Sequence, residues 1–233
     1  MRHPPRTVRR VADTPGIVGS GAGDSVSIRL MVLTDPEPAC GKPLVDVVEE
    51  CLIAGANAIQ LRDKAATDRL LYDQAVQLVE RTGRHGALLI VNDRFDVALA
   101  AGADGVHLGP GDMPIETVRM HADADFLIGY STDDPIAGML AAEAGADYLG
   151  VGAVFGTTSK AGLAEEAIGV ERVAQVLHSA GLPGVGIGGI TASNAAEVFE
   201  TGAGVAVLSA VMHAPDPGAV VRRLLAVAEA HAG

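Results

Sequence analysis

The chain has 233 residues, 48% of them hydrophobic and 20% charged, which fits one large globular domain or two small ones. Its formal net charge of -12 argues against nucleic acid or an anionic membrane surface as a partner, because the overall field repels both. No charge-free apolar stretch is long enough to span a membrane, and the two cysteines are too far apart for a CxxC site, so we expect a cytoplasmic protein.

Residues 1–26 are rich in Pro, Gly and Arg and have no periodic apolar pattern. We predict a disordered N-terminal extension over 1–26, followed by one catalytic domain over 27–233. No apolar segment follows the early arginines, so we expect no secretory signal. An organellar transit peptide stays open as an alternative, since the first twelve residues carry no acid.

From residue 27 onward, short apolar runs alternate with amphipathic, Ala-rich stretches that are typical of helices. The runs, in chain order, are 28–33, 55–61, 88–92, 102–108, 126–130, 145–151, 185–189 and 202–208. They are continuously apolar rather than alternating, which indicates strands buried on both faces and therefore a parallel sheet.

Four of these runs resemble one another, which indicates an internal repeat. Those at 55–61, 102–108, 145–151 and 202–208 each open with Gly-Ala at the end of a helical stretch. Glycine is the residue that most readily ends a helix in a left-handed conformation. Eight strand–helix units in about 200 residues predict an α/β fold, the single-domain (β/α)₈ TIM barrel. A doubly wound open sheet is the competing fold.

The active sites of such barrels lie at the carboxyl ends of the strands. Polar and small residues gather at these ends in the sequence. They are Gln60, Arg62, Lys64, Asn92, Asp93, His107, Asp112, Ser131, Thr157, Ser159, Lys160, Gly188, Gly189 and Ser209. The strands that precede Asp93 and Asp112 are neighbours, so this acid pair could hold Mg²⁺. Helix capping is the competing role for Asp93.

Basic and glycine residues at the same ends point to phosphate. Arg62, Lys64 and Lys160 can form charge-assisted hydrogen bonds to phosphate oxygens. Gly188-Gly189 and Ser209 occupy the corner that this fold often uses for phosphate, although a tight turn alone would also select glycine. The GxGxxG match ending at Gly189 lies within a strand run, and no acid follows roughly 20 residues later, so we reject a dinucleotide site.

No catalytic triad follows from the spacing of Ser, His, Cys and Asp. His107 is the one His inside a strand run, and a buried structural role fits it at least as well as a catalytic one. Tyr148 and Phe155 are expected to be packing residues.

Seven motifs at successive strand ends resemble the thiamine phosphate synthase family, and the resemblance runs from about residue 27 to the C-terminus. The motifs are Gln60-Leu-Arg-Asp-Lys64, Val91-Asn-Asp-Arg94, Gly105-Val-His-Leu-Gly109 with Asp112, Gly129-x-Ser131, Val154-Phe-x-Thr157-x-Ser159-Lys160, Gly186-Ile-Gly-Gly-Ile190 and Val207-Leu-Ser209. Each is weak alone, but the ordered set is specific. The resemblance implies a Mg²⁺-dependent transferase that condenses a pyrimidine diphosphate with a thiazole phosphate by a dissociative mechanism.

The resemblance also implies a role for each matched residue. The pyrimidine diphosphate would be held by Gln60, Arg62, Lys64, Asn92, Ser131 and Lys160, of which Arg62, Lys64, Ser131 and Lys160 would be catalytic. Mg²⁺ would bind Asp93 and Asp112. The thiazole phosphate would be held by Thr157, Ser159, Gly189, Leu208 and Ser209. The implied partners are these two small molecules, and a homo-oligomer is left open.

This chain departs from the family pattern at a few positions. Gly156 replaces a usual Pro, Ser159 a usual Thr and Tyr130 a small aliphatic residue, while Pro110-Gly111 replace a more polar pair. The nearest rival function is a thiazole tautomerase on the same scaffold, which uses a His directly after the Ser131 position and lacks the need for both acids. A sugar-phosphate isomerase barrel and a non-catalytic phosphate-ligand-binding barrel are two further rivals.

Overall fold

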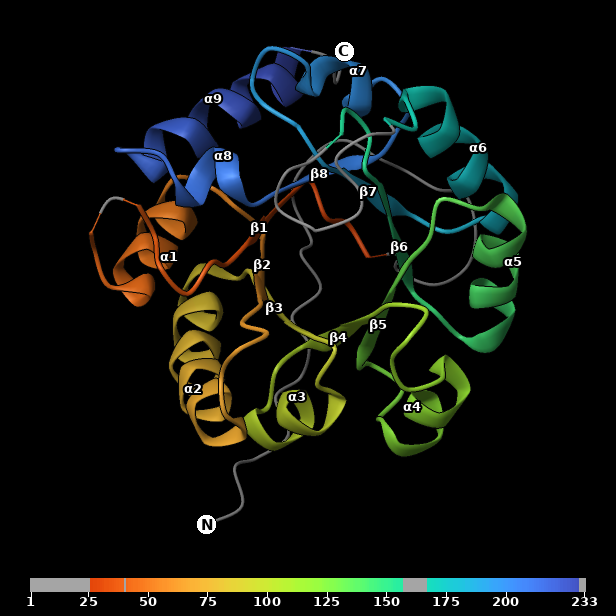
Figure 1. Cartoon of the computed structure of the whole chain (residues 1–233), viewed down its shortest axis with the longest axis horizontal. Coiled ribbons are helices and arrows are strands. Elements are labelled where there is room, and N and C mark those ends of the chain that lie inside the picture. The colour runs from red at the N-terminus through yellow and green to blue at the C-terminus, as the bar shows by residue number, and fades with distance from the viewer. Residues whose placement is uncertain (1–25, 40, 157–166, 231–233) are drawn as a thin grey trace.

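The computed structural model describes residues 26–39, 41–156 and 167–230. Eight parallel strands close into a barrel in which each strand pairs with its neighbours in chain order, and β8 pairs with β1 (Figure 1). The strands are β1 (Leu30–Leu33), β2 (Ala58–Leu61), β3 (Leu88–Asn92), β4 (Gly105–Leu108), β5 (Leu127–Ser131), β6 (Tyr148–Gly152), β7 (Gly184–Ile187) and β8 (Gly204–Val207). The predicted (β/α)₈ barrel is therefore confirmed.

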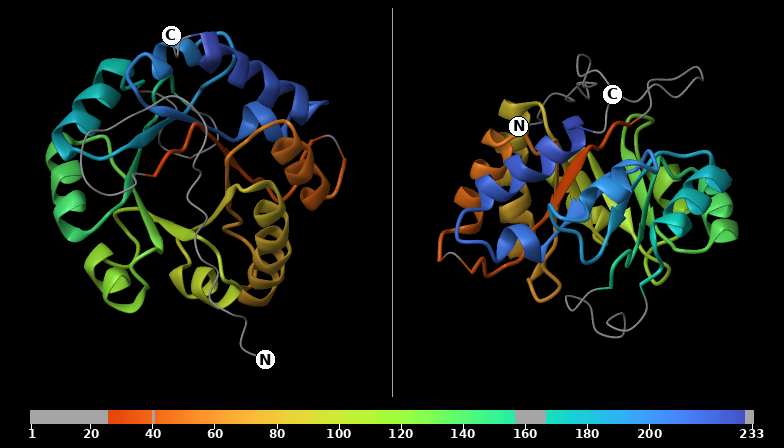
Figure 2. Two further views of the ribbon diagram at one scale, coloured as in Figure 1. Left: turned by 180° about the vertical axis from the view of Figure 1, so that it is seen from behind. Right: turned by 90° about the horizontal axis from the view of Figure 1, so that it is seen from above.

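Helices surround the barrel on the outside (Figure 2). They are α1 (Leu44–Ile53), α2 (Asp68–His85), α3 (Phe95–Ala101), α4 (Ile115–His121), α5 (Pro135–Ala144), α6 (Val170–Ala180), α7 (Ala195–Phe199), α8 (Ser209–Met212) and α9 (Pro217–Ala230). No helix in the described ranges is long and apolar enough to cross a lipid bilayer.

The strands are buried on both faces, as their continuous apolar character predicts. Alternate residues point outward, such as Ile59 and Leu89, and join one large apolar core beneath the helices. The residues between them point inward and form a second, smaller core within the barrel, with Met31, Ile90 and Tyr148 among its members. This inner core fills the barrel, so a site is expected at its carboxyl mouth.

The repeated glycines end helices in the predicted manner. Gly102 and Gly145 are the C-caps of α3 and α5, and both have positive φ angles. Gly55 and Gly202 follow α1 and α7 with φ angles of 106° and 83°. At these angles a residue with a Cβ atom is strained, which explains the glycine at each start of the repeat.

Two boundaries differ slightly from the sequence expectation. The run at 185–189 contributes a strand only over Gly184–Ile187, after which Gly188 and Gly189 turn with positive φ angles. Val26, one residue before the predicted start of the catalytic domain, already packs against the inner core, and the domain bounds stay a prediction. Residues 1–25 lie outside the described part, and their predicted disorder stays a prediction.

Candidate active site

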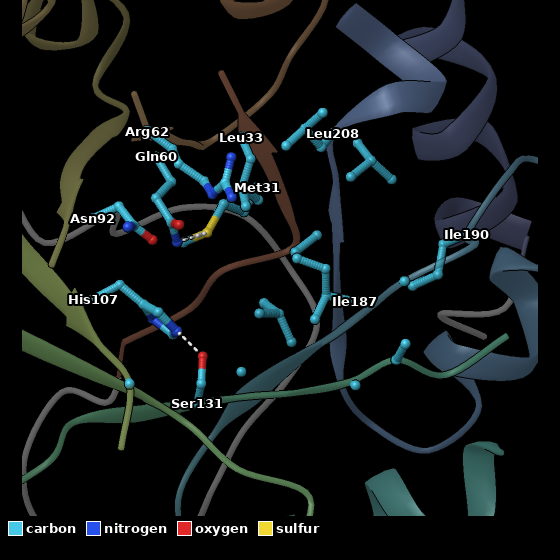
Figure 3. A pocket seen from close by; sticks show the side chains of 18 of the residues that line it. Met31, Leu33, Gln60, Arg62, Asn92, His107, Ser131, Ile187, Ile190 and Leu208 are labelled. Atoms are coloured by element: carbon cyan, nitrogen blue, oxygen red, sulfur yellow. Dashed lines mark hydrogen bonds between the residues drawn. The ribbon is translucent and has the colours of Figure 1, made fainter. Parts of the chain in front are cut away.

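A cavity of about 590 Å³ opens at the carboxyl end of the barrel, and its wall includes residues from or just after every strand (Figure 3). Ten of the residues singled out by the family resemblance line it. They are Gln60, Arg62, Lys64, Asn92, Asp93, Asp112, Ser131, Gly189, Leu208 and Ser209. Thr157, Ser159 and Lys160 lie outside the described residues, so their places stay predictions. The fold thus brings together strand ends that are far apart in sequence.

The β2 end places one amide and one guanidinium in the cavity. Gln60 is buried, and its Nε2 atom donates to the Met31 sulfur at 3.4 Å, which holds the amide in place (Figure 3). The backbone of Arg62 is tied to Thr34: its N–H donates to Thr34 Oγ1 at 2.9 Å, and that hydroxyl reaches back to the Arg62 carbonyl at 3.2 Å. The chain is therefore fixed at the point where Arg62 enters the mouth.

Asp63 lies between these two bases and forms a local turn. Its Oδ1 atom accepts from the backbone N–H groups of Ala65 at 3.0 Å and Ala66 at 2.9 Å. Asp commonly forms turns of this type. The turn carries the chain away from the cavity, while Lys64 stays on the cavity wall.

Asp93 and Asp112 form a pair of acids at the ends of β3 and β4. The Gly109 N–H donates to Asp112 Oδ2 at 2.6 Å, and Lys64 Nζ lies 3.3 Å from Asp93 Oδ2. Burial raises the pKa of Asp112, and the neighbouring negative charge of Asp93 raises it further. The two carboxylates are therefore close enough to repel each other, and a cation between them would relieve that repulsion.

This pair fits Mg²⁺, which takes one or two protein carboxylates and completes its shell with water and substrate phosphate. In the described ranges no cluster of three or more His, Cys, Asp or Glu side chains is suited to a metal, so water and substrate would supply the remaining ligands. Helix capping does not explain Asp93, because α3 begins after Arg94 and has no side-chain cap hydrogen bond. Asp93 also has a φ angle of 61°, which is unusual for a residue other than glycine.

The β7 and β8 ends form a corner with very little side-chain volume. A Cβ atom on Gly188 would lie 2.6 Å from Ala153 Cβ, and one on Gly189 would lie 2.6 Å from the Gly156 carbonyl oxygen. Only glycine fits at either position, as the turn requires, and the predicted phosphate-binding role of this corner stays a prediction. Ser209 begins α8 and is exposed at the same corner.

Sequence reasoning missed a pair of side chains in the cavity floor. His107 Nε2 lies 2.8 Å from Ser131 Oγ (Figure 3). His107 Nδ1 lies 3.0 Å from the Tyr148 hydroxyl. The residue spacing indicated no Ser–His arrangement, yet the barrel forms one. Its signal is the register: β4 and β5 are neighbours, and Ser131 lies one inward position beyond the residue opposite His107, which is Gly129.

Sequence reasoning also missed an apolar part of the cavity wall. Met31 and Leu33 from β1, Ile187 from β7 and Leu208 after β8 face the space (Figure 3). Among these, only Leu208 was singled out from the sequence. A strand residue that lines a ligand space cannot be told from one that packs the core by hydrophobicity alone.

A family model for thiamine monophosphate synthase matches residues 30–211. The chain belongs to this family. The matched range begins with β1 and ends within α8, so it contains every strand of the barrel.

Individual members of the thiamine monophosphate synthase family resemble the chain over most of their length. A thiamine-phosphate synthase from Natronomonas pharaonis is 47% identical over 195 residues, covering 83% of this chain and 91% of the relative. One from Chloroflexus aurantiacus is 42% identical over 203 residues, covering 87% and 93%. The solved thiamine phosphate pyrophosphorylase from Pyrococcus furiosus is 42% identical, covers 88% of this chain and 98% of its own, and has a TM-score of 0.80.

Proposed function

We propose that this chain condenses 4-amino-2-methyl-5-(diphosphooxymethyl)pyrimidine with 4-methyl-5-(2-phosphooxyethyl)thiazole to give thiamine phosphate and diphosphate. The observation that carries the proposal is one cavity in which the bases after β2, the Asp93–Asp112 pair and the glycine corner after β7 meet. Family membership and the names of relatives at 42–47% identity support the same reaction.

The polar side of the cavity is suited to a diphosphate leaving group. The bond from the pyrimidine methylene carbon to the diphosphate oxygen breaks with its electron pair moving to the oxygen. Arg62, Lys64 and, by family resemblance, Lys160 offset the negative charge that develops there, and the Gln60 and Asn92 amides orient the pyrimidine. Mg²⁺ held by Asp93 and Asp112 would neutralise the same diphosphate.

The apolar wall suits the electron-deficient methylene carbon that remains. Met31, Leu33 and Ile187 present only hydrocarbon and a thioether to the cavity, so these side chains offer no hydroxyl, amine or carboxylate to compete for the carbon, and the Met31 sulfur already accepts from Gln60. The thiazole nitrogen then attacks the carbon, while the corner at Gly189 and Ser209 anchors the thiazole phosphate. No enzyme nucleophile is needed in this scheme, and both substrates react while held side by side.

The rival functions fit the cavity less well. A thiazole tautomerase would need a His after Ser131, but Thr132-Asp133-Asp134 follow there, and it would have no use for two neighbouring acids. A sugar-phosphate role rests on shared fold alone: the 3-hexulose-6-phosphate synthase from Salmonella typhimurium has a TM-score of 0.69 but only 20% identity. A non-catalytic phosphate binder would not require the acid pair and the bases together.

The test is to mix both heterocycles with Mg²⁺ and the protein and to quantify diphosphate and thiamine phosphate. We expect equal amounts of the two products, formed only when both substrates and Mg²⁺ are present. Absence of both products with folded protein would refute the proposal. We further propose that the enzyme works in the cytoplasm without a nucleic acid or membrane partner, as its acidic charge and low cysteine content suggest.

A further inference from the structure

Three side chains from neighbouring strands form a hydrogen-bonded chain that runs from the inner core to the cavity. Tyr148 of β6 lies at the buried end, His107 of β4 in the middle, and Ser131 of β5 at the cavity. Tyr148 is only 1% exposed and His107 only 7%, whereas Ser131 is half-buried. The hydrogen-bonded series therefore runs from a fully buried hydroxyl at Tyr148 to a partly exposed one at Ser131.

The barrel makes space for this arrangement with two inward-facing glycines. A Cβ atom on Gly129 would lie 2.2 Å from Tyr148 Cζ and 2.4 Å from His107 Nδ1. A Cβ atom on Gly150 would lie 2.9 Å from His107 Cε1. Any larger residue at either position would displace the ring of His107 or Tyr148, so the hydrogen-bonded pair depends on these glycines of β5 and β6.

The burial of Tyr148 sets the direction of the hydrogen bonds. Burial raises the pKa of Tyr148 well above its ordinary value, and the nearby Asp147 charge adds to this, so the hydroxyl keeps its proton. Among the described residues, the hydrogen-bond partner of that hydroxyl is His107 Nδ1. A buried O–H without an acceptor is costly, so Tyr148 donates and Nδ1 accepts.

The direction of the first hydrogen bond determines the tautomer of His107 and so the direction of the second. A neutral histidine carries one N–H and one bare nitrogen, so a bare Nδ1 places the proton on Nε2. Nε2 therefore donates to Ser131 Oγ at 2.8 Å. With its oxygen accepting from His107, the Ser131 hydroxyl can turn its own proton toward an acceptor in the cavity.

We propose that Tyr148 and His107 are positioning residues that fix Ser131 as a hydrogen-bond donor, aimed at a phosphate oxygen of the departing diphosphate. This is the opposite polarity to a Ser–His pair in which the His takes the Ser proton to make a nucleophile. Ser131 would thus stabilise developing negative charge and form no covalent bond. The role at the diphosphate rests on the proposed function, whereas the direction of the hydrogen bonds does not.

The direction is tested by NMR on the full-length protein labelled with ¹⁵N in its histidine rings. His107→Gln identifies the His107 signals among those of the seven histidines. We expect a neutral ring with the proton on Nε2 and a bare Nδ1. A proton on Nδ1 would overturn the proposal, whether or not the protein has synthase activity.

The catalytic consequence is tested by a double-mutant cycle with Tyr148→Phe and Ser131→Ala. We expect Tyr148→Phe to lower kcat roughly tenfold with little change in the KM for the thiazole phosphate, as for the loss of one oriented donor. In the Ser131→Ala background the same change should lower kcat by less than about twofold, because the donor is already gone. A merely structural role of Tyr148 would lower kcat equally in both backgrounds and would contradict the proposal.

Tyr72→Phe is the matched control, because it removes a hydroxyl from α2, outside the cavity wall. It should leave kcat and the histidine spectrum unchanged. If Tyr148→Phe does not fold, the wild-type spectrum still decides the hydrogen-bond direction. If the wild type has the expected His107 tautomer but no synthase activity, the proposed function fails while the direction stands.

Discussion

Arg62 and Lys64 follow β2 only two residues apart, yet their surroundings in the cavity differ. Lys64 is 58% exposed and already shares an ion pair with Asp93. Arg62 is half-buried, and in the described part of the chain its guanidinium has no carboxylate partner. A less exposed cation without such a partner gains more from an incoming phosphate, so we propose Arg62 as the stronger diphosphate ligand of the two.

Replacement of Arg62 by Gln should therefore lower kcat/KM for the pyrimidine diphosphate by about 100-fold, from the loss of a charge-assisted pair. The KM for the thiazole phosphate should stay within about twofold. Steady-state kinetics with each substrate varied in turn measures both values. Arg69→Gln on the outer face of α2 is the control and should change neither, and equal effects of Arg62→Gln on both substrates would contradict the assignment.

The raised pKa of Asp112 should make the free energy of unfolding depend on pH. A carboxyl whose pKa is higher in the folded than in the unfolded state loses stability as pH rises from its ordinary pKa through the raised one. In the absence of Mg²⁺, Asp112→Asn should therefore be more stable than wild type at neutral pH and equal to it at low pH. The Asn carbonyl can still accept from the Gly109 N–H. Urea unfolding at several pH values measures the difference.

Mg²⁺ should reverse that order. At ten times its Kd, bound Mg²⁺ should stabilise the wild type by about 1.4 kcal/mol, or about 3–5 °C in Tm for a domain of this size. Asp112→Asn should show a much smaller shift, and Ca²⁺-free buffers with and without Mg²⁺ provide the comparison. A metal-free Asp112→Asn that is less stable than wild type at neutral pH would refute the like-charge interpretation of the pair.

Among the strands and loops, β7 and the turn after it are closely packed by their neighbours along their whole length. Cβ atoms on Gly184 and Gly186 would lie 2.4 Å from Leu177 of α6 and 2.7 Å from Val198 of α7. These helices therefore pack directly on the strand backbone. Beyond the strand, Gly188 approaches Ala153 in the loop after β6 equally closely. The corner thus links the loop after β6 to the end of the cavity where we propose that the thiazole phosphate binds.

Gly188→Ala tests this close approach against a matched glycine. Gly188 has a φ angle of 102° and no space for Cβ, whereas Gly181, the C-cap of α6, has a φ angle of 65° and open space. Gly181→Ala should cost about 1 kcal/mol from backbone strain alone. Gly188→Ala should cost about 3 kcal/mol or more, because overpacking adds to the strain. Urea unfolding measures both values, and equal costs would show that the close approach contributes nothing.

At the scale of the whole molecule, all eight strands of the closed barrel lie between Leu30 and Val207. β1 begins at Leu30 and pairs with both β2 and β8, so the sheet closes within the described range. Ile28 belongs to the inner core, and Val26 packs against it. We therefore propose a domain boundary just before Val26; the family model matches from residue 30, where β1 begins.

A chain that begins at Val26 should therefore keep the Tm of the full chain within about 2 °C, because it retains every strand of the barrel and the inner-core contacts of Val26 and Ile28. Its kcat should also be unchanged. Differential scanning calorimetry and the two-substrate assay measure these values. A chain that begins at Leu30 is the comparison: it loses the inner-core contacts of Ile28 and should be less stable. A large loss on removal of residues 1–25 alone would refute the predicted extension.

Local patterns in the sequence were enough to establish the architecture and the family. The continuous apolar runs and the Gly-Ala repeat are local properties of the sequence. The runs indicate strands that are buried on both faces, and the glycines mark positions that can end a helix. The order of the strand ends then placed Arg62, Asp93 and Ser131 at one mouth, because parallel strands in a barrel all end on the same side.

Which side chains touch within that mouth depends on the closed barrel. The Ser131–His107–Tyr148 chain, the apolar wall at Met31 and the repulsion between Asp93 and Asp112 depend on register between strands and on distances of a few ångströms. Strand register and interatomic distances cannot be derived from positions in the sequence, because residues separated by tens of positions meet only when the barrel closes. The sequence alone predicted which residues lie at the mouth of the barrel, and only the folded structure determined which of them interact.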